Sequence, residues 1–452
     1  MVFVTKMRTG LIALMVALSL IALSGCAQQQ KEEAPAEQSA TTEETSQAAP
    51  ENTFPEVHFL TGERASSGDT VWAIVDADGN KASFADESWI PLGPCTEGYV
   101  FVTWETSDYD KEWEQETNKV THYGIVGADG QLAYDLTERV AALSSDSVRV
   151  DVAQEGDNCF VDGLLVFMSK EGTGVNPTLT AVNTSGDTVY TLGEKNRQVS
   201  FDLLDDPDAY HDGVICVTGP RRSSAILDTT GKILAQTGED EGYLQSLGNG
   251  YMVNSDTPDK VTDYAGNVLF DVESINVEGD IDKAETYVRQ PGAGGIVVVS
   301  AEKVNPYGGA NKHLYGIYSI SANKWIVPLC EGFNGQNVIA DDGVVCVTVN
   351  DKLYLSEGYG AEVGNNPESY TCLMDYEGNV ILDADTDLSE YMPDGRSFAL
   401  DEIDPEYLQD GIWKLADAAS GKTVLVHIAD GAIQAAKTVD FSIRGSYPNN
   451  AS

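Results

Sequence analysis

Basic residues are scarce in this sequence of 452 residues, which has 27 lysines and arginines against 72 aspartates and glutamates and a formal net charge of -45 at pH 7. A surface with this balance repels polyanions, so nucleic acid is excluded as a partner. The same charge argues against docking of the folded body on anionic lipid. We therefore expect a soluble body whose copies repel one another.

Patterns that carry catalysis or bind metals are also missing. There is no Gly-x-Ser-x-Gly elbow, no Ser-x-x-Lys set resembling that of penicillin-binding proteins, and no phosphate-binding loop. The histidines are scattered without ligand spacing and are His58, His122, His211, His313 and His427. We therefore predict no catalytic residue, no metal site and no cofactor.

Cysteines with the spacing of a redox or metal motif are absent too. Cys26 aside, the cysteines are Cys95, Cys159, Cys216, Cys330, Cys346 and Cys372. An even number outside the cytoplasm permits disulfides. Most of them, however, lie in apolar runs such as GVICVTG and GVVCVTV, where a thiol behaves as a small hydrophobe. This setting favours buried thiols over bridges.

The N-terminus carries a secretory signal, in which Lys6 and Arg8 precede an uncharged apolar run from Leu11 to Leu23. That run is too short for a typical membrane-spanning helix. Leu23-Ser24-Gly25-Cys26 resembles the lipobox of bacterial lipoproteins. The resemblance implies that residues 1–25 are removed and that Cys26 bears a diacylglycerol thioether with acyl chains of the palmitate type. Two acyl chains give stable membrane anchoring.

Residues 26–54 contain the lipidated cysteine and a stretch rich in Gln, Glu, Ala, Ser and Thr. This composition cannot bury enough apolar surface to offset the entropy of ordering, so it predicts a disordered tether. A flexible coil of this length spans about 30 Å. We assign residues 55–452 to one folded domain, because regular all-β architectures reach this size.

Short β-rich runs fill the folded domain, and they repeat. VWAIVDADGNKASF at 71 aligns with stretches that start at 122, 179, 224, 260, 314 and 371, and more loosely with KLADAASGKTVLVHI at 414. The shared turn has Asp or Asn first and Gly fourth, as a turn closing a β-hairpin requires. Its predicted residues are Asp76, Gly79, Gly130, Gly186, Asp228, Gly231, Asp263, Gly266, Asp375 and Gly378.

The first of these turns resembles the start of a calcium-binding loop, with acidic or amide side chains at Asp76, Asp78 and Asn80. Such a loop needs Gly at its sixth position and flanking helices. Here Lys81 is sixth, and the flanks are strand-like. Between copies, Asp78 is replaced by Ser, Thr, Ala or Glu, whereas the Asp-x-x-Gly frame persists. The pattern therefore predicts a structural turn.

A second element, Gly followed by four or five strand formers, precedes six of the hairpins, at 96, 161, 211, 248, 293 and 341. The repeat unit is thus about 50 residues, the length of a propeller blade. The pattern resembles the WG repeat of bacterial surface proteins, with Trp72-Ala73, Tyr123-Gly124 and Tyr315-Gly316 at the dipeptide position. We therefore predict an all-β fold, a β-propeller of seven or eight four-stranded blades, eight being favoured.

The two ends of the repeat region are unassigned by the repeat. EVHFL at 56 and TVDFSIR at 438 are both strand-like. A propeller must close on itself, since each blade leaves edges that need a neighbour. We therefore expect these two segments to complete one blade together.

The loops between the predicted strands are the candidate regions for contact with a ligand. Acidic loops such as SDYDKEWEQE at 107 are consistent with a solvated rim, calcium ligands or paired carboxylates of a glycosidase. Aromatic side chains on loops grip glycans or peptides, although packing between blades explains each one equally simply. The tryptophans are Trp72, Trp89, Trp104, Trp113, Trp325 and Trp413.

These observations predict a lipid-anchored, extracytoplasmic binding or scaffold protein that recognises a protein, peptide or glycan through its propeller loops. The alternative is a propeller-fold glycoside hydrolase or lyase acting on surface polysaccharide, so enzyme activity stays open. A solute-binding lipoprotein would need two α/β lobes, and helical patterns are scarce. The nearest is YDLTERVAALSS at 134.

Overall fold

The computed structural model describes residues 54–66, 68–110, 115–143, 148–151, 160–171, 175–192, 213–218, 222–274, 281–291, 295–303, 312–333, 339–341, 343–358, 361, 368–392, 405–416 and 421–444. By its contacts the chain divides into two units, Met1–Glu51 and Asn52–Ser452, and the described residues belong to the second. The predicted lipobox, signal and most of the tether lie outside them. Among the described residues, no helix is long and apolar enough to span a membrane.

The described strands form eight antiparallel sheets, called A to H in chain order, and in each sheet the strands follow one another as a meander. Sheet A has β1 (His58–Arg64), β2 (Thr70–Asp76) and β3 (Lys81–Ser83); B has β4 (Ile90–Pro91), β5 (Tyr99–Asp110), β6 (Gln115–Gly127) and β7 (Leu132–Asp135); C has β8 (Val148–Asp151), β9 (Leu164–Glu171), β10 (Val175–Asn183) and β11 (Thr188–Leu192); D has β12 (Val214–Thr218), β13 (Ser224–Asp228) and β14 (Ile233–Gln236).

The second half of the chain continues the same order. Sheet E has β15 (Leu244–Ser246), β16 (Tyr251–Asn254), β17 (Lys260–Asp263) and β18 (Val268–Asp271); F has β19 (Ile281–Pro291), β20 (Ile296–Lys303), β21 (Lys312–Ser319) and β22 (Lys324–Cys330); G has β23 (Ile339–Asp341), β24 (Val344–Val349), β25 (Tyr370–Asp375) and β26 (Val380–Leu382); H has β27 (Glu406–Gln409), β28 (Ile412–Ala416), β29 (Thr423–Ala429) and β30 (Ala432–Val439). Within the described ranges the short helices are α1 (Thr137–Leu143), α2 (Leu353–Glu357), η2 (Val272–Ser274) and η5 (Ser389–Tyr391).

The protein is therefore all-β, as predicted. Six of the eight sheets have four described strands, whereas A and D have three. Strands in the middle of a sheet are apolar on both faces, because each sheet is covered on both sides. In β20, for example, every residue from Ile296 to Ala301 is buried.

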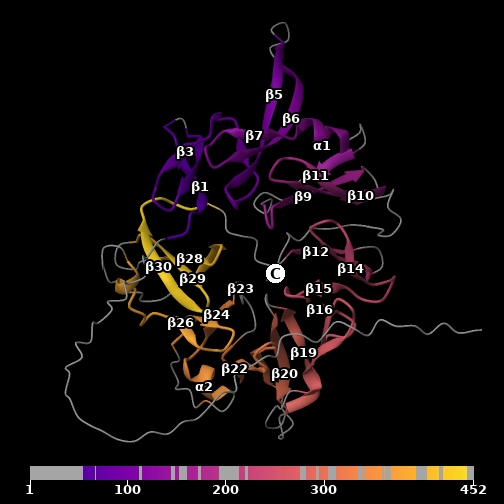
Figure 1. Cartoon of the computed structure of the whole chain (residues 1–452), viewed down its shortest axis with the longest axis vertical. Coiled ribbons are helices and arrows are strands. Elements are labelled where there is room, and N and C mark those ends of the chain that lie inside the picture. Colours follow the sequence, from indigo (N-terminus) through magenta and orange to yellow (C-terminus); the bar gives the residue numbers. More distant parts are fainter. Residues whose placement is uncertain are drawn as a thin grey trace, which may run out of the picture. The chain divides into compact units, whose positions relative to one another are not determined.

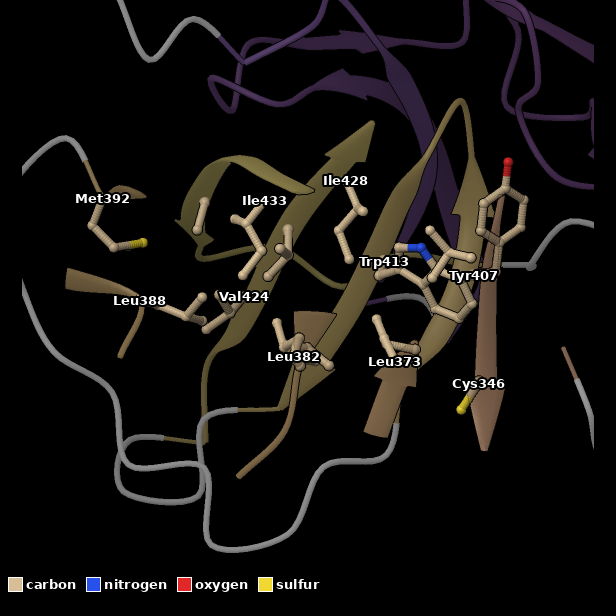
Figure 2. Packing of buried hydrophobic residues seen from close by; sticks show 14 residues of the cluster. Cys346, Leu373, Leu382, Leu388, Met392, Tyr407, Trp413, Val424, Ile428 and Ile433 are labelled. Atoms are coloured by element: carbon tan, nitrogen blue, oxygen red, sulfur yellow. The ribbon is translucent and has the colours of Figure 1, made fainter. Parts of the chain in front are cut away.

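Each sheet packs against the next through a shared apolar cluster. Seven such clusters join consecutive sheets, from A and B to G and H. An eighth cluster contains Phe59 of β1 together with Leu425 of β29. Sheet H thus packs against sheet A, and Figure 1 shows β28–β30 next to β1. Figure 2 shows the cluster between G and H, where Cys346 and Leu373 of G approach Tyr407 and Trp413 of H.

The expectation that the two end segments complete one blade is met in part, because the segments come together without forming a strand ladder. β1 pairs with β2 in sheet A, and β30 pairs with β29 in sheet H. The short segment after β30 does return to β1, however. The Arg444 backbone N–H donates to the Leu60 carbonyl at 2.8 Å, and the rings of Phe441 and Phe59 lie 6.5 Å apart. The ends meet through this segment rather than through a shared ladder.

The loosest of the predicted repeat copies is out of register. Its glycine, Gly421, follows β28, so that connection joins the second and third strands of sheet H. The equivalent of the other hairpin turns joins β29 to β30 through Asp430 and Gly431, both with positive φ. A Gly flanked by strand formers occurs at both connections, and the spacing alone cannot tell them apart.

The described cysteines, Cys95, Cys216, Cys330, Cys346 and Cys372, are thiols, and all but Cys216 are buried. Cys216 lies in β12 of sheet D and Cys346 in β24 of sheet G, so these two thiols belong to sheets that are not adjacent. Burial raises the pKa of the Cys330 thiol to about 11. Cys159 lies outside the described residues.

Candidate carboxylate pocket

A pocket of about 620 Å³ lies where sheets H, A and B meet. It is lined by the start of β1, the turn before β5, the turn between β6 and β7, and the turn between β27 and β28. In an antiparallel meander the first-to-second and third-to-fourth connections lie at the same end of the sheet, which is why these turns gather. The acidic side chains and the histidine of the pocket are Glu56, His58, Glu97, Asp129 and Asp410.

Glu97 lines the pocket and also connects sheet B to sheet C. Glu97 and Gly98 have φ of 52° and 78°, and Thr96 and Tyr99 exchange both backbone hydrogen bonds, at 2.9 and 3.1 Å, so this is a two-residue hairpin turn of the I′ type. Asn or Asp is usual at its first position, and a glutamate there carries a backbone cost that its side-chain contacts must offset. Both Glu97 carboxylate oxygens accept from the Gly163 N–H at 3.0 Å.

Gln409 connects the same turn to sheets A and H. Its side-chain Oε1 accepts from the Glu97 N–H at 3.3 Å, and its Nε2 donates to the His58 carbonyl at 2.8 Å. The side chain is almost completely buried, so both of its polar ends are satisfied inside the protein. Gln409 therefore fixes the relative positions of the pocket walls.

The turn before β5 belongs to a family of equivalent turns. Asp162-Gly163, Asn249-Gly250 and Asp410-Gly411 have the same pair of positive φ angles. The Asp162 Oδ2 accepts from the Gly213 N–H at 2.7 Å, so sheet C is linked to sheet D as B is linked to C. In these two links, an acidic residue before the turn glycine accepts from the turn glycine of the next sheet.

The electrostatics of the pocket are dominated by carboxylates. Burial, together with the nearby charges of Asp162 and Asp410, raises the pKa of Glu97, although the hydrogen bond from Gly163 opposes the shift. Against the four carboxylates of the lining stands one histidine, His58. Such a pocket favours a cationic group or a hydrogen-bond donor. The described residues contain no group of three or more His, Cys, Asp or Glu side chains that could hold a metal ion.

The aspartates of the predicted hairpin turns use their carboxylates within the turn. Asp76 Oδ1 accepts from the backbone N–H of Asp78 at 2.8 Å and of Asn80 at 2.9 Å, and Oδ2 accepts from the Asn80 amide at 2.7 Å. Equivalent bonds occur around Asp228, Asp263 and Asp375. Gly79, Gly130, Gly186, Gly231, Gly266 and Gly378 all have positive φ. Of these turns, the structure places Gly127–Gly130 at the pocket.

The tryptophans pack on the body. Trp413 and Trp89 are buried. The other three cover backbone glycines, since a Cβ added to Gly62, Gly124 or Gly316 would meet the ring of Trp72, Trp104 or Trp325 within about 3.0 Å. Packing, rather than glycan binding, therefore explains these five side chains. The side chain of Trp113 lies outside the described part.

Sequence reasoning missed the pocket residues Glu97, Gln409 and Asp410. It identified the glycine before the strand formers, but not the acidic or amide residue that precedes it. It also missed the copy at Asp410-Gly411. A signal was present, because Glu-Gly, Asp-Gly and Asn-Gly recur at 97, 162, 249 and 410. What the signal could not give is which glycine each carboxylate contacts.

No protein-family model matches the chain, and no curated protein matches it. Among solved structures it is similar to BamB from Moraxella catarrhalis, at 10% identity over 81% of this chain and 97% of that chain, with a TM-score of 0.35. It is also similar to AztD from Citrobacter koseri, at 10% identity over 87% and 96%, TM-score 0.31, and to the Cps50 (Swd1) β-propeller domain of Myceliophteria thermophila, at 9% over 83% and 100%, TM-score 0.29. Identities and TM-scores this low say nothing about function, so the candidate site rests on the contacts within this chain alone.

Proposed function

We propose that this chain is a lipid-anchored, extracytoplasmic binding or scaffold protein whose body is an eight-bladed β-propeller. In this proposal Cys26 carries the lipid, residues 27–54 form the tether, and the carboxylate pocket receives a cationic group of a protein or peptide partner. The proposal keeps the predicted localisation at the cell membrane, facing away from the cytoplasm.

The packing order of the sheets supports the propeller. The eight sheets are arranged in series, and each shares an apolar cluster with the next. The last sheet also shares a cluster with the first, which is the arrangement that blades around an axis require. The described links from Glu97 to Gly163 and from Asp162 to Gly213 join consecutive first turns. In a propeller these turns surround the axis.

The observation that carries the binding role is the charge of the pocket. Four carboxylates line about 620 Å³, and one of them, Glu97, is held at a raised pKa by burial and by neighbouring acids. A lysine or arginine side chain would relieve that repulsion, whereas a neutral glycan would not. We therefore favour a protein or peptide over a glycan as the partner.

The test is crosslinking on intact cells that produce the chain, followed by identification of the proteins recovered with it. Glu56→Gln with Asp129→Asn removes two exposed carboxylates from the pocket, and the double variant Glu377→Gln with Asp240→Asn removes the same charge elsewhere. We expect the pocket variant to lose most of a reproducible partner and the control to retain it. Equal recovery from both would contradict the role of the pocket. In the same cells, Cys26→Ser should move the chain to the soluble fraction.

One observation favours the second candidate, a glycoside hydrolase or lyase. A glutamate with a raised pKa near other carboxylates is the pattern from which a general acid is made. Turnover of a surface polysaccharide that is abolished by Glu97→Gln, with the melting temperature unchanged, would support this candidate. Absence of turnover together with a reproducible protein partner would reject it.

A further inference from the structure

Strands β5 and β6 are much longer than the strands beside them. β5 has 12 residues and β6 has 13. β4 pairs only with Thr103 and Val102 of β5, and β7 pairs only with Gly124 to Val126 of β6. Figure 1 shows the two strands extending past the rest of sheet B. From Glu105 to Asp110, β5 therefore has a described strand partner on one side only.

The parts of β5 and β6 that extend past their neighbours, Glu105–Asp110 and Gln115–Thr121, form a two-stranded ribbon. The two outer edges of this ribbon differ. Thr106 pairs with Val120 and Asp108 with Thr117, which leaves Asn118 and Lys119 opposite Ser107 alone. The extra residue is on β6, and Asn118 has φ +52°. A bulge and a lysine are two devices by which natural sheets protect an edge from pairing. β5 has neither between Glu105 and Asp110, so its outer edge is regular and available.

The backbone direction along β5 can be followed from its base. The Leu92 N–H donates to the Phe101 carbonyl at 2.8 Å, so the backbone groups of Phe101 point toward the β4 side. Because these groups alternate along a strand, those of Thr103 and Glu105 point to the same side. β4 begins at Ile90, opposite Thr103. A strand added at Glu105 would therefore continue the line of β4.

The negative charge of the ribbon indicates what kind of strand would add to its outer edge. Glu105 and Asp108 are exposed, and the nearest described cation, Lys119, lies 4.0 Å from Glu105 in an exposed ion pair. Between 105 and 120 the sequence has six acidic and two basic residues. A second copy of an equally acidic ribbon would be repelled, whereas lysines or arginines would be attracted.

We propose that the outer edge of β5, from Glu105 to Asp110, is a docking strand for an extended basic segment of a partner protein, which adds to sheet B in line with β4. Backbone hydrogen bonds would supply the affinity of such β-augmentation, and alternate side chains would supply its specificity. Lysine or arginine on one face of the added strand would pair with Glu105, while Asp108, on the opposite face of β5, adds to the negative charge that attracts the segment. The docking strand does not include the carboxylate pocket, so either proposal can fail without the other.

The test uses the full chain in detergent and a synthetic ten-residue peptide of alternating lysine and valine, with binding followed by fluorescence anisotropy. Glu105→Pro removes the outward N–H of the docking strand without removing a β5–β6 hydrogen bond. Thr121→Pro is the matched control, because Thr121 is the register partner of Glu105 and its N–H points out of the protected β6 edge. Melting temperatures of both variants confirm that they fold.

We expect Glu105→Pro to weaken peptide binding at least about tenfold and Thr121→Pro to change it less than about twofold. Glu105→Gln with Asp108→Asn should weaken binding and reduce its dependence on salt. Equal binding by both proline variants would overturn the proposal, because the peptide would then be held only by the general negative charge. Equal binding of a glutamate-valine peptide would also overturn it, as would a wild-type dimer that Glu105→Pro dissociates.

Discussion

The aspartate that opens each hairpin turn is the repeated residue whose role is clearest. Asp263 Oδ1 accepts from the backbone N–H of Ala265 at 2.9 Å and of Asn267 at 2.8 Å, and Oδ2 accepts from the Asn267 side-chain amide at 2.8 Å. The side-chain bond from Asn267 is the main cause of a lowered pKa of Asp263, and the backbone bonds add to it. The ionised carboxylate is therefore part of the folded turn.

Asp263→Ala should lower the melting temperature at pH 7, because three hydrogen-bond donors lose their acceptor. Since the folded pKa lies below the unfolded one, the stabilisation is present above pH about 4 and is lost as the pH falls through the folded pKa. The difference between wild type and variant should therefore narrow in acid. Thermal melts at pH 7 and below pH 3 measure it. Glu377→Ala, at an exposed position of another such turn, should show no difference at either pH.

At the scale of the element, glycines in equivalent hairpin turns are not equivalent in packing. Gly130 of sheet B has φ +74°, and a Cβ added to it would lie 2.3 Å from the Ser83 carbonyl oxygen of β3. Gly266 of sheet E has φ +83°, yet nothing lies within 4 Å of an added Cβ. The first glycine is needed for both its conformation and the approach of the preceding sheet, whereas the second is needed for conformation alone.

Gly130→Ala should therefore cost more stability than Gly266→Ala. The alanine at 266 suffers only the penalty of a left-handed conformation, about 1 kcal/mol. The alanine at 130 also displaces backbone, so we expect at least about 2 kcal/mol. Urea unfolding of the two variants beside the parent measures the difference, and equal losses would contradict the packing argument.

Hairpins of this kind are the part of the fold that the sequence predicts well, because Asp or Asn and Gly are needed locally by the turn itself. Asp228 and Gly231, for example, could be assigned to a hairpin turn from the few residues around them. The site is different, because Glu97 and Gly163 are 66 residues apart and contact each other only through packing of two sheets. A sequence that repeats shows which residues recur, but not which copy each one contacts.

The whole molecule depends on how its two ends meet. Sheet A lacks a described strand on the β1 side, and the segment from Asp440 to Arg444 lies there, bonded once to Leu60. Phe441 and Ile443 pack against the cluster shared by sheets H and A. In the proposed ring of blades, opening this closure would remove one interface between sheets, so we expect the terminal segment to contribute to the stability of every sheet.

A chain that ends at Val439 should therefore unfold at lower temperature and less cooperatively than one that ends at Arg444. Phe441 and Ile443 are partly buried, so removing these two side chains costs about 2 to 3 kcal/mol, and the Arg444 hydrogen bond adds about 1 kcal/mol. Differential scanning calorimetry compares both truncations with the parent. The chain that ends at Arg444 keeps the contacts with β1 and should melt like the parent. If the chain that ends at Val439 also melts like the parent, closure does not depend on the segment, and the cluster of Phe59 and Leu425 must hold the ring by itself.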